Sequence, residues 1–319
     1  MTYWKIVKIK MNIYSIKIIK IYFYEYIMLY SGLVNLGNTC YINSVLQILH
    51  SMYELNEYIR EDNNYNKTTN DYIITKEWHN LKELMDKGVH ISPNRFIYMH
   101  NEICKEKNKL EFIQNKQGDA SEYLLFLLEC IHNSYAKKDN SIITQLFLSL
   151  FEITYVDESN IKVSKTYEKH WSIDLSIPVK DNITLYDCLD YTLKKEYLCD
   201  DNAWLDDKTN EKKNVYKITK IVQEPILLVF NFKRWIKFDK KNKSKISFDT
   251  IIDLSAYSNL KTKYELFGII NHEGNIYGGH YYSFIKKRDK WILFNDNEIK
   301  EISNLILASN YCLFYRKIK

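Results

Sequence analysis

The chain has 319 residues, of which 46% are hydrophobic and 27% are charged, and its formal net charge is +5. This composition is typical of a globular protein with one large domain or two small ones, and so mild a charge does not favour nucleic-acid binding. The six cysteines form no C-x-x-C pair and no secretory signal precedes them, so we expect free thiols in an intracellular protein of the cytoplasm or nucleus.

Residues 1–30 form an N-terminal extension of unknown role before a domain of residues 31–319. The extension is apolar and aromatic, but five lysines interrupt it. No uncharged run approaches the roughly 18 residues that a membrane-spanning helix needs, so we expect no membrane association. The extension is compatible with an extra element packed on the domain, with an unstructured segment, or with translation upstream of a start at Met28.

The first part of the domain, residues 31–140, is predicted to be mainly helical. Apolar residues recur at helical spacing within 40–60: Ile42, Val45, Leu46, Leu49 and Tyr53. The helical pattern continues through 72–135. Asp119 and Glu122 have the spacing of a capping box, which predicts that the last helix of this part begins after Asp119.

After about residue 145 the chain changes to short runs of β-branched and aromatic residues. These runs are FEITYV, NIKVSKTY, ILLVFNFKRW, KISFDTIIDL, YELFGIIN, HYYSFIKK and KWILFN. We therefore predict an α+β fold in which residues 141–319 are mainly antiparallel strands, with a short helix at 185–194. Residues 200–214 are predicted as a charged turn and residues 237–245 as a basic hairpin tip or loop.

A glycine-marked turn precedes Cys40 at the start of the first predicted helix. A helix N-terminus lowers the pKa of a cysteine, and the thiolate is its nucleophilic form. Asn38 and Thr39 are the expected caps of this helix. The Asn35 amide and the Cys40 backbone N–H can supply the donors that an oxyanion requires. Taken alone, Cys40 is as compatible with a small buried core residue as with a nucleophile.

The candidate base is His280 in the run YGGHYYSFIKKRDKWILFNDNEI. Strands flank a turn at 287–290, and a hairpin centred there pairs residue 282 with residue 295. His280 is then a diagonal neighbour of Asn295 on one face, within the roughly 7–8 Å that such pairs span. An Asn or Asp there can fix the imidazole tautomer and leave the other nitrogen facing a thiol. The alternative is a structural histidine.

Several segments together resemble the ubiquitin-specific protease family. GLVNLGNTCYINSVLQ is similar to its cysteine box, and YELFGIINHEGNIYGGHYYSFIKKRDKWILFNDNEI is similar to its histidine box. KQGDASEYLLFLLECIH resembles its Gln-x-Asp-Ala box with the following helix, and EPILLVFNFKRW resembles a strand motif of the LPxxLVxxLKRF type. The motifs occur in the family's order, and the resemblance covers about residues 32 to 316.

This resemblance implies a papain-like cysteine protease fold with a helical thumb and an antiparallel β palm and fingers. By motif position, Cys40 is the nucleophile and His280 the general base. Asn295 orients His280, and Asn35 is the oxyanion donor. Asp296 is a further contributor, or the orienting residue if the register slips by one.

The resemblance also implies a narrow channel for the C-terminal tail of ubiquitin. The residues expected to bind the tail are Gln117, Asp119, Gly278, Gly279 and Tyr281. The Asp119 carboxylate suits the basic tail, and helix capping is its other possible role. The expected partners are ubiquitin and ubiquitinated proteins, and we expect a monomer without a cofactor.

The chain departs from the family pattern in two places. Gln-Gln-Asp is Gln-Gly-Asp at 117–119, which removes one polar contact. Many members bind zinc through two C-x-x-C pairs in the fingers, but the corresponding segments EITYVDESNIKVSKTYEKHW and LDDKTNEKKNVYK contain no cysteine. We therefore predict no bound metal, and short fingers that depend on strand packing alone.

The motifs together predict a deubiquitinase that hydrolyses the isopeptide or peptide bond at the C-terminal glycine of ubiquitin through a Cys40 thioester. Two alternatives stay open: a protease for another ubiquitin-like modifier, and a catalytically inactive ubiquitin-binding module. The complete catalytic set argues against the inactive module. A nucleic-acid binder has little support, because a basic run such as 237–245 is usually a solvated loop.

Overall fold

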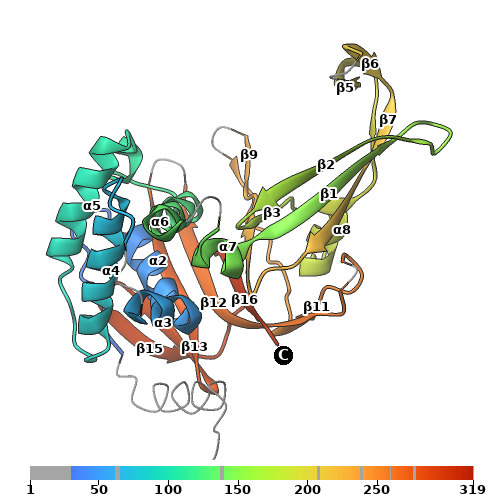
Figure 1. Ribbon diagram of the computed structural model, residues 1–319. Helices are drawn as coiled ribbons and strands as arrows, with labels where there is room; N and C mark the ends of the chain where they lie inside the picture. Colours follow the sequence, from blue (N-terminus) through green and yellow to red (C-terminus); the bar gives the residue numbers. More distant parts are fainter. Residues whose placement is uncertain are drawn as a thin grey trace, which may run out of the picture.

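The computed structural model describes residues 30–61, 65–136, 140–206, 209–237, 240–258, 260–275 and 278–318. The predicted N-terminal extension lies outside these ranges, apart from Tyr30. Helices come first and strands follow, as predicted for an α+β fold (Figure 1). Within the described ranges, no helix is long and apolar enough to cross a membrane.

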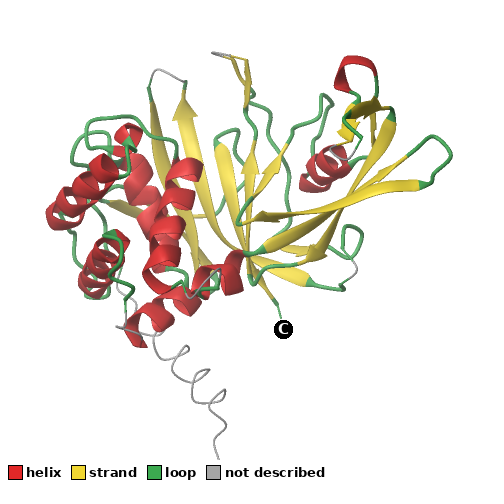
Figure 2. Cartoon of the chain, turned by 45° about the horizontal axis from the view of Figure 1, so that its top comes forward, coloured by secondary structure: helices red, strands yellow, loops and turns green. Residues whose placement is uncertain are grey.

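The helices up to residue 147 gather at one end of the molecule (Figures 1 and 2). They are α2 (Cys40–His50), α3 (Tyr53–Glu61), α4 (Asp71–Met85), α5 (Asn94–Glu106), the 3-10 turn η1 (Leu110–Phe112), α6 (Ala120–Tyr135) and α7 (Ile142–Phe147). Every residue of α2 is buried, because this helix lies between the other helices and the sheet. The single helix predicted over 40–60 is wrong: the chain turns at Ser51, while buried Met52 and Leu55 continue the apolar pattern.

The central sheet has the strand order β15-β14-β13-β12-β16-β8-β3, and β11 pairs with β12. Its strands are β3 (Ile173–Leu175), β8 (Leu227–Phe232), β11 (Ile251–Asp253), β12 (Lys263–Gly274), β13 (Gly279–Lys287), β14 (Lys290–Asn295), β15 (Glu298–Ile302) and β16 (Asn310–Lys317). Except for the parallel pair β3–β8, the pairings are antiparallel. The predicted strand at 245–254 is shorter than expected and comprises β11 alone.

The two faces of the sheet bury different hydrophobic cores. Side chains of β13 such as Tyr281 and Ile285 pack against the helices. Phe284 and Leu293 point to the other face, into a second core that α8 (Leu185–Leu193) helps to close. Successive side chains of a strand point to opposite faces, so each of these strands contributes to both cores.

The β13–β14 hairpin has the predicted register. Lys287 pairs with Lys290, and Ser283 pairs with Phe294, so that residue 282 stands opposite residue 295. Arg288 in the connecting turn has a φ of 56°. This short turn fixes the pairing, and it places alternate residues of the two strands on the same face.

A second sheet, here called the finger sheet, projects away from the helices (Figure 1). Its order is β2-β1-β7-β4, with β1 (Ser149–Val156), β2 (Lys162–His170), β7 (Val215–Gln223) and β4 (Glu196–Leu198). β1 has eight residues, and β2 and β7 have nine each. The mean strand has roughly 5–6 residues, so the expectation of short fingers is wrong.

The tip of the finger sheet carries a small hairpin of β5 (Trp204–Asp206) and β6 (Glu211–Lys213), which follows the 3-10 turn η2 (Asp200–Asn202). The prediction of a simple charged turn over 200–214 is therefore wrong. Tyr155 stacks on Trp204 at 5.0 Å between ring centroids, and Tyr197 lies 4.7 Å from Tyr216. Aromatic packing holds this end together.

The basic segment predicted at 237–245 belongs to a small hairpin of β9 (Trp235–Lys237) and β10 (Lys240–Lys241). Its base is fixed by Arg234, whose fully buried guanidinium donates to the carbonyls of Asn310, Asn242 and Ser244. Among the residues that the structure describes, no group of three or more His, Cys, Asp or Glu side chains is placed to hold a metal ion. The absence of a bound metal stays a prediction.

Candidate active site

Cys40 is the first residue of α2, and its side chain is 4% exposed. Thr39 occupies the N-cap position but makes no side-chain cap hydrogen bond, so the predicted side-chain cap is wrong. Its hydroxyl instead accepts the Leu36 N–H at 2.9 Å and donates to Asn35 Oδ1 at 3.3 Å. The N–H groups of the first turn have no partner within the helix, so this end of α2 carries a partial positive charge.

The turn before Cys40 requires glycine at position 37. Gly37 has a φ of +96°, and a Cβ added there would meet Asn115 Oδ1 at 2.3 Å. Asn38 follows with a φ of 53° and donates its side-chain amide to the Asn115 carbonyl at 3.1 Å. The chain at Gly37 therefore lies so close to Asn115 that a residue with a side chain does not fit there.

Asn35 is held from both ends of its amide. Its Oδ1 accepts the N–H groups of Gly37 at 3.0 Å and Thr39 at 3.2 Å. Its Nδ2 donates to Asp296 Oδ2 at 3.0 Å. Asp296, which directly follows β14, thus orients the amide nitrogen of Asn35. That nitrogen has a second N–H, which is available to another acceptor.

His280 lies at the start of β13, half-buried, between Cys40 and Asn295. Its Nε2 is 2.5 Å from Asn295 Oδ1, which leaves Nδ1 as the nitrogen available to the Cys40 thiol. The bond to Cys40 raises the pKa of His280 to about 9, and the bond to Asn295 adds to this, although burial acts in the opposite direction. The imidazole therefore keeps a proton at neutral pH.

The charge of Asp296 helps to raise the pKa of His280, and its hydrogen bonds join the turn after β14 to the residues around Cys40. Its Oδ1 accepts the Asn43 amide of α2 at 2.8 Å, and its Oδ2 accepts Asn35. Its backbone carbonyl accepts the Leu33 N–H at 3.0 Å. Of the two candidates for orienting His280, Asn295 is the one that makes the contact. The sequence reasoning missed Asn43 as part of this connection.

Gln117 connects the two sides of the predicted tail channel. Its Oε1 accepts the Gly279 N–H at 3.1 Å, and its Nε2 donates to Asn38 Oδ1 at 3.2 Å. Gly279 is required because a Cβ there would lie 2.1 Å from His272 Nε2. Gly278 faces open space, with nothing within 4 Å of an added Cβ.

Asp119 caps α6, as its spacing predicted. Its Oδ1 accepts the N–H groups of Ser121 at 2.7 Å and Glu122 at 3.2 Å. Its Oδ2 accepts the hydroxyls of Tyr281 at 3.3 Å and Tyr311 at 2.5 Å. Burial, with the nearby Asp119 carboxylate second, raises the pKa of both tyrosines far above their usual range. No signal near Tyr311 in the sequence predicts this contact, because β16 lies at the far end of the chain.

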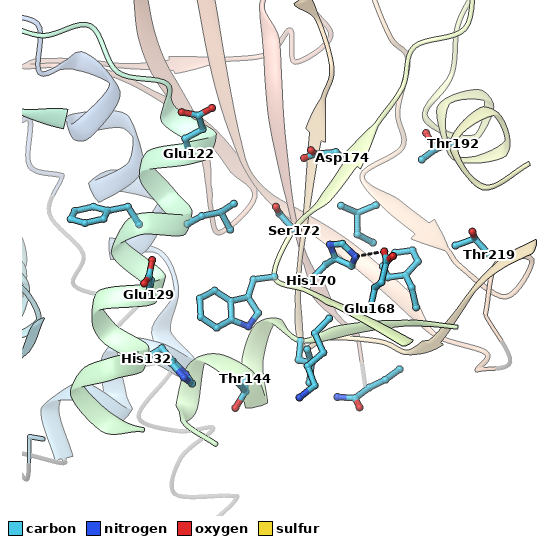
Figure 3. A pocket seen from close by; sticks show the side chains of 18 of the residues that line it. Glu122, Glu129, His132, Thr144, Glu168, His170, Ser172, Asp174, Thr192 and Thr219 are labelled. Atoms are coloured by element: carbon cyan, nitrogen blue, oxygen red, sulfur yellow. Dashed lines mark hydrogen bonds and ion pairs between the residues drawn. The ribbon is translucent and has the colours of Figure 1, made fainter. Parts of the chain in front are cut away.

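A cavity of about 1620 Å³ opens between α6 and the base of the finger sheet (Figure 3). Glu122 and Glu129 project from α6 toward it, and Asp174 of β3 lies on the far side. Burial, Asp119 and Glu111 raise the pKa of Glu122, so several carboxyl groups compete for the same region. The lining therefore presents groups of both charges, because it also contains Lys109, Lys169, Lys217 and Lys233.

Comparisons with known proteins agree with this geometry. The family model described as "UCH: Ubiquitin carboxyl-terminal hydrolase" matches residues 31–315. Similar curated relatives include "Ubiquitin carboxyl-terminal hydrolase Usp2" of Drosophila melanogaster, 27% identical over 90% of this chain and 34% of that protein. "Ubiquitin carboxyl-terminal hydrolase 8" of Saccharomyces cerevisiae is 29% identical over 89% of this chain and 70% of that protein. The chain thus spans only about a third of the length of the fly relative.

Solved structures with the same fold include Ubp8 in the SAGA DUB module with Sgf11, Sus1 and Sgf73. The form bound to monoubiquitin has a TM-score of 0.75 and 25% sequence identity, and covers 92% of this chain and 70% of that one. The form bound to ubiquitin aldehyde has a TM-score of 0.75 and 26% identity, and covers 91% of this chain and 70% of that one. The predicted papain-like fold with a helical thumb and β palm and fingers is confirmed.

Proposed function

Since the chain belongs to the ubiquitin carboxyl-terminal hydrolase family, we propose that it is a cysteine deubiquitinase that cleaves the bond after the C-terminal glycine of ubiquitin. The observation that carries this proposal is the position of His280 between Cys40 and Asn295, with its pKa raised to about 9. A thiol beside an oriented, proton-holding imidazole is the arrangement that acyl transfer by a cysteine requires.

The proposed reaction begins with the Cys40 proton on His280. The thiolate attacks the glycine carbonyl, and the oxyanion accepts hydrogen bonds from the Cys40 backbone N–H and the second N–H of Asn35. His280 Nδ1 then gives its proton to the leaving nitrogen as the carbon–nitrogen bond breaks. Water, deprotonated by His280, attacks the thioester and releases ubiquitin and the thiol.

Asn295 and Asp296 have separate tasks in this scheme. Asn295 accepts the Nε2 proton of His280 and so keeps Nδ1 directed at the sulfur. Asp296 holds the Asn35 amide, and the remaining N–H of that amide is directed away from the carboxylate. Consecutive residues on one turn therefore orient the base and the oxyanion donor.

The proposed tail channel includes Gln117, Asp119, Gly278, Gly279 and Tyr281, and the cavity of Figure 3 would receive the globular part of ubiquitin. The open space at Gly278 supports passage of an extended chain. The carboxyl groups of Asp119 and Glu122 support binding of a basic tail, because a cation nearby relieves their mutual repulsion.

We further propose that the chain acts as an intracellular monomer with no metal or other cofactor. Ubp8 was solved within a module of several subunits, so light scattering of the active protein is the appropriate check on the monomer. Elemental analysis checks the metal: stoichiometric zinc in the purified chain would contradict the proposal for the fingers.

Ubiquitin bearing a thiol-reactive propargyl amide at its C-terminus tests the proposed activity. We expect a covalent adduct that Cys40→Ala abolishes and that the control Cys104→Ala keeps, because Cys104 is buried on α5 and contacts His100. Retained ubiquitin binding without an adduct would favour the inactive module. An adduct with another ubiquitin-like modifier alone would move the substrate assignment to that modifier.

A further inference from the structure

A second pocket, of about 540 Å³, adjoins the catalytic histidine. Its lining includes His280 and Asn295, the rings of Tyr282 and Phe284, Leu293 and Glu273. This volume lies within the range of roughly 300–1,000 Å³ that is typical of ligand sites. The pocket is therefore continuous with the candidate active site and large enough for more than one side chain.

The pocket is lined by Tyr282 and Phe284 of β13, whereas Tyr281 of the proposed tail channel packs on the helix-covered face of the sheet. Tyr281 points toward α6, where its hydroxyl reaches Asp119. Its neighbours His280 and Tyr282 point to the other face, because side chains alternate along a strand. A ubiquitin tail that arrives on the Asp119 side therefore leaves the group beyond its last glycine on the His280 side.

Glu273 contributes a carboxylate to the same pocket as the catalytic histidine. In the β12–β13 ladder, Glu273 is the residue that pairs with His280. Directly opposed residues share a face, with Cβ atoms roughly 4.5–5.5 Å apart. Glu273 Oε1 accepts the Tyr282 hydroxyl at 2.7 Å, and the side chain stays exposed. Lys300, the cation in the lining, pairs with Glu298 at 2.7 Å.

We propose that this pocket is the subsite for the leaving side of the substrate: the acceptor lysine of the ubiquitinated protein and a basic residue next to it. The inference rests on the proposed function. The rings of Tyr282 and Phe284 and the side chain of Leu293 give the methylene stem of the acceptor lysine an apolar surface. The Glu273 carboxylate attracts a basic neighbour and repels an acidic one.

Glu273 also suits the chemistry of the leaving nitrogen. As His280 transfers its proton, that nitrogen carries positive charge until the carbon–nitrogen bond breaks and the amine departs. A carboxylate on the same face favours this charge. It likewise favours the ammonium that the released lysine forms by taking a proton from water.

Ubiquitin joined through an isopeptide bond to short lysine peptides tests this subsite. Two peptides differ only in the residue after the acceptor lysine, which is arginine in one and glutamate in the other. We expect kcat/KM to favour the arginine peptide by roughly fivefold, the effect of one partly solvated charge pair. Glu273→Gln keeps an oxygen for the Tyr282 hydroxyl but removes the charge, and we expect it to reduce the preference to less than about twofold.

Glu265→Gln is the matched control. Glu265 lies on the same strand, pairs with Lys286 at 2.6 Å and is absent from the pocket lining, so this variant should keep the arginine preference. The ubiquitin propargyl amide has no residue on the leaving side and reports on Cys40 and the tail channel alone.

An arginine preference that survives Glu273→Gln would overturn the subsite. So would a parallel loss of propargyl amide capture and peptide cleavage in that variant, because Glu273 would then act at the nucleophile. Capture by the wild-type chain without any preference between the peptides also rejects the subsite, while leaving the deubiquitinase proposal intact. Failure of both capture and cleavage in the wild-type chain would overturn the deubiquitinase proposal itself.

Discussion

The helical end of the molecule contains a second cysteine–histidine pair besides the candidate catalytic one. Cys104 Sγ lies 3.3 Å from His100 Nε2, and both residues belong to α5. Cys40 and His280 instead come from the starts of a helix and a strand, α2 and β13, that pack against each other. The residue types are the same in the two pairs, so the differences between the pairs show what their surroundings contribute.

The two histidines have pKa values shifted in opposite directions. The hydrogen bond to its cysteine raises the pKa of His280 to about 9. Burial lowers the pKa of His100 to about 4, although a hydrogen bond to Asn101 acts in the other direction. Burial also raises the pKa of Cys104 to about 12. At neutral pH the α5 pair is therefore an uncharged thiol and an uncharged imidazole.

Position explains this difference. Cys104 lies in the last turn of α5, where the helix dipole disfavours an anion, and His100 is fully buried among the rings of Phe96, Tyr123 and Phe126. Cys40 begins its helix, and its half-buried histidine partner is at the open end of a strand. An adjacent cysteine and histidine form a reactive pair only where charge can be stabilised.

Replacing one histidine from each pair should give the largest contrast. We expect His280→Ala to lower kcat/KM for a ubiquitin isopeptide by about a thousandfold, because both proton transfers depend on this residue. His100→Leu should keep the rate within about twofold, since this pair does not contact the site. Steady-state kinetics measure both effects. A large rate loss in folded His100→Leu would show that the two pairs are coupled.

The free energy of unfolding at low pH should report on the buried pair of Cys104 and His100. The pKa of His100 is lower in the fold, about 4, than in the unfolded chain, about 6.5, so the unfolded state binds more protons between these values. The free energy of unfolding should therefore fall by up to about 3 kcal/mol as the pH falls from 6.5 to 4.

Urea unfolding of wild type and His100→Leu at pH 7 and pH 5 measures this contribution. The variant should lose less stability on acidification. Part of the decrease should remain, because burial also lowers the pKa of His50 to about 4. An unchanged pH dependence in His100→Leu would contradict the assignment.

Replacing the asparagine beside each histidine should show whether the rate depends on the orientation of the imidazole or only on local packing. Asn295→Ala should lower kcat/KM by about ten- to a hundredfold, because the imidazole loses the acceptor that fixes its tautomer. Asn101→Ala, on α5, should leave the rate within about twofold. Equal losses in the two variants would contradict a specific role for Asn295.

The alkaline limb of the pH–rate profile should report on the candidate catalytic pair. His280 holds its proton up to about pH 9 and loses it above that value, so kcat/KM should fall about tenfold per pH unit beyond it. Any stability that comes from this raised pKa is present below about pH 6.5 and is lost as the pH rises through 9. In Asn295→Ala the limb should move to lower pH, because one of the interactions that raise the pKa is missing. If the alkaline limb does not move in this variant, it reports on the titration of a group other than His280.

Cys104→Ala should have the smallest effect. We expect an unchanged rate and a loss of about 1 kcal/mol in the free energy of unfolding, the cost of removing a small buried group. Denaturant unfolding together with the propargyl amide reaction measures both quantities. Slower capture of ubiquitin by this variant would contradict a purely structural role.

Local features of the fold could be predicted from the sequence. A turn at 287–290 fixes the register of its own hairpin, which is why residue 282 stands opposite residue 295 as expected. The cap at Asp119 depends on two N–H groups within three residues. The break at Ser51 was missed because the apolar pattern continues across it, and periodicity reports burial rather than backbone direction.

Long-range contacts of the candidate site could not be predicted in this way. The bond from Asn35 to Asp296 spans 261 residues, and the bond from Gly279 to Gln117 spans 162. Such contacts depend on how the helical end and the sheet pack, which no local pattern encodes. The resemblance to the family identified the site residues themselves. Their hydrogen-bond partners, such as Tyr311 for Asp119, follow only from the assembled fold.

The position of Asp296 has a consequence for the order of events during synthesis. Its carboxylate holds Asn35 and Asn43, which leave the ribosome some 253 to 261 residues earlier. Until the β13–β14 hairpin has been made and added to the sheet, Cys40 has neither its base nor an oriented oxyanion donor. The nascent chain is therefore expected to remain a latent thiol, with hydrolytic competence arising only when the last strands dock.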